Sequence, residues 1–98
     1  MMSQTRDIPL QEAAFIAIKA LAYISQIEAE MLKFLAETGV QTADVIRLKE
    51  NLDFLAGVLD FVNRDETLLM AFVASEGFEV SQIDGARRAL LAVSENKA

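Results

Sequence analysis

The sequence predicts an all-α fold, a compact orthogonal or irregular bundle of five to six short helices. Apolar residues recur at helical spacing, and glycines and capping residues divide the chain into short segments. No useful stretch alternates apolar and polar residues as a half-buried strand would. Short helices joined by tight corners do not suit a long up-and-down bundle, so we expect helices that cross one another.

The first helix is expected from Pro9 to Tyr23 or Ile24, because a proline suits the first helical turn, where its missing N–H would be unpaired. Apolar residues surround this segment on nearly every side, and only Lys19 and a few other polar residues interrupt them. A helix of this kind is usually central, so we place it inside the bundle or at a dimer interface.

Caps and stops mark the later helices. Ser25 and Glu28 have the spacing of a capping box, so a second helix should start here. Glycine reaches the left-handed conformation without steric cost and is expected to end the second and fifth helices. The proposed N-caps of the third, fifth and sixth helices are Thr42, Asp65 and Ser81, the chain turns near Glu50 and Asn51, and the proposed stops are Gly39 and Gly77.

The chain is long enough for one domain, which we place at residues 9–93, between a disordered N-terminal segment at 1–8 and a disordered tail at 94–98. The core is expected to consist of large apolar side chains from most of the helices. These are Phe15, Ile18, Leu21, Leu32, Leu35, Phe54, Leu55, Val58, Leu59, Phe61, Leu69 and Phe72.

Composition excludes several kinds of chemistry. The chain has no cysteine and no histidine, so it lacks disulfides, zinc–thiolate sites and the usual general base near neutral pH. Its net charge of −6 would repel DNA and anionic membranes. Residues 1–7 do not resemble a signal peptide and no apolar run is long enough to span a bilayer, so we expect a cytoplasmic protein.

Two seven-residue stretches resemble one another, Phe34–Val40 and Phe72–Phe78. Each consists of a helix end, a glycine stop and an apolar residue. One interpretation is that helix–glycine–helix corners look alike for reasons of capping alone. The other is an old duplication whose two halves pack with pseudo-symmetry.

The same corners have the outline of a helix-turn-helix, with a glycine in the turn and apolar residues at the expected offsets. Those residues are Gly39, Val45 and Leu48 in one corner and Gly77, Ile83 and Ala86 in the other. A DNA reader also needs side chains aimed at bases and phosphates. The available basic residues, Arg47, Lys49, Arg87 and Arg88, stand beside Asp44, Glu50 and Asp84, so nucleic-acid binding is the alternative and not the favoured interpretation.

Three side chains are candidates for a catalytic role. Asp53 and Asp60 lie seven residues apart and share a helix face, as paired carboxylates for acid–base or metal chemistry would, but a solvated stripe explains them better. Lys19 in an apolar helix suggests a nucleophile of lowered pKa, whereas a stem lying along the surface or a pairing with Glu12 is the favoured interpretation. Gly57 inside a helix suggests a close approach of another helix or a tolerated exposed position.

Several longer strings, in their order and spacing, resemble a family of small all-helical alphaproteobacterial proteins of unknown function. They are Lys19–Ile24, Phe34–Gly39, Phe54–Phe61, Asp65–Phe72 and Ala86–Leu90. The likeness extends from about residue 10 to residue 91. It implies a bacterial cytoplasmic protein and carries no catalytic residues with it.

These observations favour a small regulator or adaptor that binds another protein, without catalytic activity. An apolar content of 53% is slightly high for a small soluble domain and suggests an exposed apolar surface, with a homodimer left open. We assign no catalytic, cofactor or metal residues and infer no cofactor or small-molecule substrate. The partner itself cannot be named from the residues.

Overall fold

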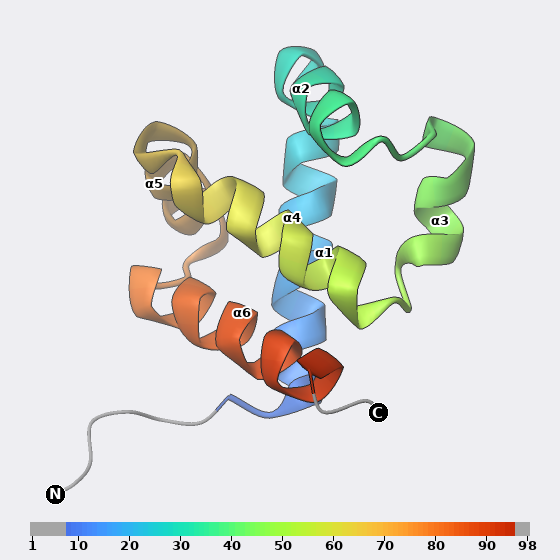
Figure 1. Ribbon diagram of the computed structural model, residues 1–98. Helices are drawn as coiled ribbons and strands as arrows, with labels where there is room; N and C mark the ends of the chain where they lie inside the picture. The colour runs from blue at the N-terminus through green and yellow to red at the C-terminus, as the bar shows by residue number, and fades with distance from the viewer. Residues whose placement is uncertain (1–7, 96–98) are drawn as a thin grey trace, which may run out of the picture.

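The computed structural model describes residues 8–95, which form six α-helices and one 3-10 turn and contain no strand (Figure 1). The predicted all-α bundle of five to six short helices is confirmed. Over that range none of the helices has the length and apolar run needed to cross a bilayer. The elements are α1 (Leu10–Ser25), α2 (Glu28–Thr38), η1 (Thr42–Asp44), α3 (Val45–Leu48), α4 (Leu52–Arg64), α5 (Glu66–Glu76) and α6 (Val80–Glu95).

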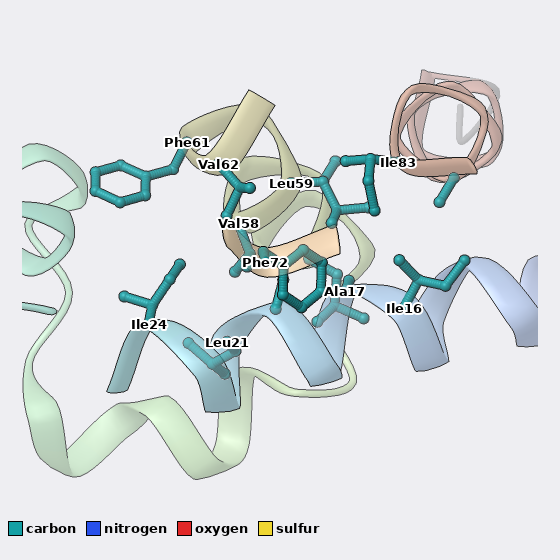
Figure 2. Close-up of a cluster of buried hydrophobic side chains, with 14 of the residues drawn as sticks. Ile16, Ala17, Leu21, Ile24, Val58, Leu59, Phe61, Val62, Phe72 and Ile83 are labelled. Atoms are coloured by element: carbon teal, nitrogen blue, oxygen red, sulfur yellow. The ribbon is translucent and has the colours of Figure 1, made fainter. Parts of the chain in front are cut away.

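Three helices form the centre of the bundle. α1 crosses α4, and α6 packs against both of them, while α2 and α5 flank this trio (Figure 1). Figure 2 shows side chains from α1, α4, α5 and α6 meeting in a shared interior. The largest fully buried side chains are Phe34, Phe72, Ile16, Ile24, Leu55, Leu59, Ile83, Leu90, Val58 and Val62.

The predicted core is partly confirmed. Seven of its residues are buried: Leu21, Leu55, Val58, Leu59, Phe61, Leu69 and Phe72. Ile18, Leu35 and Phe54 are only partly buried and pack at the margin of the core. Phe15 and Leu32 are exposed, at 56% and 60% of their surface, so their assignment to the core is wrong. A helix that is apolar on nearly all sides does not reveal from its own sequence which side faces inward.

Four of the predicted helix ends are confirmed. Asp65 caps α5, because its side chain accepts a hydrogen bond of 3.1 Å from the N–H of Leu68. The chain turns near Asn51 as expected, and the Asn51 side chain caps α4 by accepting a hydrogen bond of 2.9 Å from the N–H of Phe54. Gly39 and Gly77 end α2 and α5 with φ angles of +74° and +77°. These are left-handed conformations that side chains with a Cβ rarely adopt.

Three predicted caps are wrong. Ser25 is still the last residue of α1, and its hydroxyl donates to the carbonyl of Ala22 and does not close a capping box on α2. Thr42 begins the 3-10 turn without a side-chain cap to α3. Ser81 lies inside α6. At the N-terminus of this helix the Gln82 side chain accepts a hydrogen bond of 2.8 Å from the N–H of Glu79.

The ends of the domain lie slightly outside the predicted limits. Ile8, expected in the disordered segment, packs at the core margin beside Gly85 of α6, where an added Cβ would lie 3.0 Å from the Ile8 Cδ1. At the other end α6 includes Ser94 and Glu95, which the sequence predicts to be part of the tail. The remaining residues predicted to be disordered, 1–7 and 96–98, lie outside the described range.

The two halves of the chain match under one offset, the 38 residues that separate Gly39 from Gly77. Adding this offset to the bounds of α2 gives the bounds of α5, and adding it to the first residue of η1 gives the first residue of α6. The inward residues of α1 also map onto those of α4: Ala17, Ala20, Leu21 and Ile24 correspond to Leu55, Val58, Leu59 and Val62, and all eight are buried.

The aromatic contacts between the two halves are related by the same 38-residue offset. Phe34 of α2 packs edge-on against Phe61 of α4, with ring centroids 5.3 Å apart. Under the offset this pair becomes Phe72 of α5 and Tyr23 of α1, whose rings are 5.5 Å apart. Each flanking helix thus places its buried aromatic ring against the central helix of the other half. Local capping does not require such an exchange, so the structure favours two pseudo-symmetric halves over the capping interpretation.

Candidate interaction surface

The structure gives the two candidate carboxylates different partners. Asp53 accepts a hydrogen bond from the Ser94 hydroxyl of α6, and Asp60 lies 3.2 Å from the Nε of Arg64 on its own helix. Among residues 8–95 no three acidic side chains gather closely enough to hold a metal ion. Asp53 and Asp60 therefore act as separate polar contacts on the surface of α4.

Lys19 pairs with an acid from another helix. Its Nζ lies 3.3 Å from Glu76 Oε1 at the end of α5, so the expected pairing with an acid is confirmed, although the acid is Glu76 and not Glu12. The same ammonium lies 5.8 Å from the centre of the Phe15 ring. The side chain stays about half exposed, which is the arrangement of an apolar stem with a solvated head and not of a desolvated nucleophile.

Three of the four basic residues at the glycine corners pair with acids of their own segment. Arg47 pairs with Asp44, while Arg87 Nη2 and Arg88 Nε lie 3.1 and 3.0 Å from the two oxygens of Asp84. The hydrogen bond from Arg87 is the main cause that lowers the pKa of Asp84 below its ordinary value. These three guanidinium groups already have carboxylate partners, which reduces the positive charge available for binding phosphate, while Lys49 is exposed and belongs to none of these pairs.

A shallow hollow of about 350 Å³ lies where α2 meets the end of α4. The Phe61 ring forms its floor, with Lys33 Nζ and Arg64 Cζ 5.8 and 5.9 Å from the ring centre. Arg64 Nη2 donates to Glu37 at 2.8 Å, which raises the Arg64 pKa. No pattern in the sequence singled out these residues, because they come from separate helices. Since Lys33 and Arg64 face Glu37, Asp65 and Glu66, the charges largely compensate one another.

The outward side of α1 carries an apolar row, which the exposed Gln11 flanks at its N-terminal end. We call it the α1 strip, and it consists of Leu10, Ala14, Phe15, Ile18 and Ala22. Residues three, four and seven apart fall on one face of a helix. Phe15 and Leu10 are exposed over 56% and 39% of their surface, Ala22 is exposed, and Ala14 and Ile18 are half-buried. Within this chain the first helix is therefore not enclosed along the strip, and the alternative of a dimer interface stays a prediction.

The sequence profile of a family described as "Protein of unknown function (DUF3572)" matches residues 10–92. The chain belongs to this family. The resemblance inferred from the sequence is thereby confirmed, whereas the alphaproteobacterial origin stays a prediction. No curated protein and no solved structure matches the chain. The family match begins at the first residue of α1 and takes in nearly all of α6, so the α1 strip and both glycine corners lie inside the family domain.

Proposed function

We propose that this member of the DUF3572 family is a non-catalytic protein-interaction module, a small regulator or adaptor of the bacterial cytoplasm that binds its partner through the α1 strip. The observation that carries the proposal is the strip itself. Single exposed apolar side chains are normal on a soluble protein, but a contiguous row along one helix commonly marks a binding surface.

The neighbouring side chains support this assignment. Phe15 is the most exposed large member of the strip, and aromatic side chains are common anchors of protein interfaces. Lys19 stands at its edge and pairs with Glu76, so this polar side chain at the rim has an intramolecular partner.

The test is affinity capture of the tagged chain from its native cells in three forms: wild type, Phe15→Asp and Met70→Asp. Met70 is a matched control because it is a large apolar residue on α5, 49% exposed and outside the strip. We expect one stoichiometric protein that survives nuclease treatment with wild type and Met70→Asp and is lost with Phe15→Asp. Identical captures from all three forms, or loss of the bound material with nuclease, would overturn the proposal.

A further inference from the structure

The pseudo-symmetry of the fold indicates what kind of element covers a surface like the α1 strip. Under the 38-residue offset, Phe15 corresponds to Asp53 and Ile18 to Ala56, both on α4. Asp53 is bonded to Ser94 of α6, and Ala56 is only 2% exposed. Part of the α4 face that matches the strip is therefore in contact with α6: Ala56 is covered and the exposed Asp53 is bonded to Ser94, whereas Asp60, the counterpart of Ala22, is half-exposed and pairs with Arg64.

Within the described chain, no comparable helix lies along the strip. η1 and α6 begin at equivalent positions, but α6 continues to Glu95 while α3 ends at Leu48, and the chain then turns into α4. η1 and α3 contain no buried residue, whereas Ile83, Ala86 and Leu90 of α6 are completely buried. In Figure 1 α6 runs beside α4, and the short α3 stands apart from α1.

We infer that the occupant of the α1 strip is an amphipathic helix of another protein, which takes the place that a longer α3 would have taken. This inference rests on the proposed function and names the chemistry of its partner. The internal example is α6, whose apolar residues recur at i, i+3 and i+7 as Ile83, Ala86 and Leu90. The partner helix presents the same spacing to the strip.

Charge decides between two possible sources of such a helix. The chain carries a net charge of −6, so two copies repel each other, and a helix with a basic polar face is attracted. We therefore assign the strip to a partner helix bearing lysine or arginine on its polar side, and not to a second copy of this chain.

The probe is a synthetic peptide with the sequence of residues 80–95 carrying Asp84→Lys, Gly85→Ala and Glu95→Lys. The alanine favours the helix and the lysines supply the basic face. Fluorescence anisotropy of the labelled peptide is followed during titration with the full-length protein. We expect saturable binding that Phe15→Asp weakens at least tenfold and that Met70→Asp changes less than twofold.

Further variants separate shape from charge. Ala22→Arg obstructs the other end of the strip and uses a good helix former at an exposed position, so it should fold and also weaken binding at least tenfold. A peptide with Ile83→Asp and Leu90→Asp should not bind. Restoring the native Asp84 and Glu95 in the peptide should weaken binding several-fold at low salt and by less at high salt.

Absence of saturable binding, or binding that Phe15→Asp and Ala22→Arg leave unchanged, would overturn the inference. Sedimentation velocity tests the second copy: a wild-type dimer that becomes monomeric with Phe15→Asp would also overturn it. Either result leaves the proposed function standing if Phe15→Asp still loses its captured protein. The proposed function fails separately, when capture does not depend on the strip.

Discussion

After Gly39 the chain forms a 3-10 turn and the four-residue α3, whereas after the equivalent Gly77 it forms the sixteen-residue α6. The two corners themselves are alike, because both glycines have φ angles near +75° and both follow a helix with a fully buried phenylalanine. The difference lies in burial, since α6 contributes three side chains to the core and α3 contributes none. A corner therefore directs the chain, and the apolar contacts beyond it decide how long the next helix is.

The buried phenylalanines before the two corners offer the strongest test of this comparison. We expect Phe72→Ala to lower the free energy of unfolding by about 4 kcal/mol and Phe34→Ala by about 3 kcal/mol. Both rings are fully buried, but Leu68 beside Phe72 is buried while Met31 and Leu35 on α2 are half-exposed, so the cavity on the α2 side relaxes more easily. Urea denaturation measures both. An equal or reversed order would contradict the tighter packing of the second half.

Equivalent positions near the start of α3 and α6 come next. Ile83 of α6 and Val45 of α3 are equivalent under the offset, yet Ile83 is fully buried and Val45 only partly. We expect Ile83→Ala to cost about 3 kcal/mol of unfolding free energy and Val45→Ala about 1 kcal/mol or less. If chemical denaturation showed a larger loss of unfolding free energy for Val45→Ala, α3 would contribute to the core at least as much as α6. That result would contradict the difference in burial between the two helices.

Replacing each corner glycine by alanine tests whether the two corners are alike. An added Cβ would meet no atom within 4 Å at Gly39 or Gly77, so the cost is conformational alone. We expect Gly39→Ala and Gly77→Ala to destabilise the fold by similar amounts, about 1–2 kcal/mol each, as differential scanning calorimetry would show. Costs that differ by more than about 1 kcal/mol would reveal a packing role at one corner.

Alanine at Gly57 should stabilise the fold, in contrast to alanine at the two corner glycines. Gly57 lies inside α4 at a partly buried position, and an added Cβ would meet nothing within 4 Å, so the expectation of a close helix approach there is wrong. Gly57→Ala should raise the free energy of unfolding by about 1 kcal/mol, because alanine is the better helix former. A melting temperature that falls would show that the glycine is needed.

The smallest effect concerns the ion pairs of Asp84 in α6. The segment after the first corner has one ion pair of this kind, Arg47–Asp44. The folded-state pKa of Asp84 is lowered mainly by the Arg87 hydrogen bond, so its stabilisation is present above the ordinary pKa of 3.8 and is lost as pH falls through the lowered value. Because the pair is exposed to water, we expect Asp84→Asn to cost about 0.5 kcal/mol or less at pH 7.

The difference between wild type and Asp84→Asn should shrink in acid and vanish below the lowered pKa. Urea denaturation at pH 7 and near pH 2 checks this. A difference that persists at the lower pH would mean that Asp84 stabilises α6 by something other than its charge.

Local signals predicted a large part of the fold. Asp65 and the two corner glycines act on backbone groups within four residues, so their effects can be read from neighbouring letters. The false caps at Ser25, Thr42 and Ser81 show the limit of this reasoning. A hydroxyl near a helix end has several backbone partners within reach, and small differences in where the helix begins select one of them.

The sequence by itself determined the helical class, the division into short segments, the family, and the lack of cysteine and histidine chemistry. Only the tertiary structure decided which side of α1 faces outward, that Lys19 meets Glu76, and that the halves exchange their aromatic contacts. The physical reason is the distance along the chain over which each kind of interaction acts. Capping and helical spacing depend on residues a turn away, whereas the burial of an all-round apolar helix depends on helices distant in the chain.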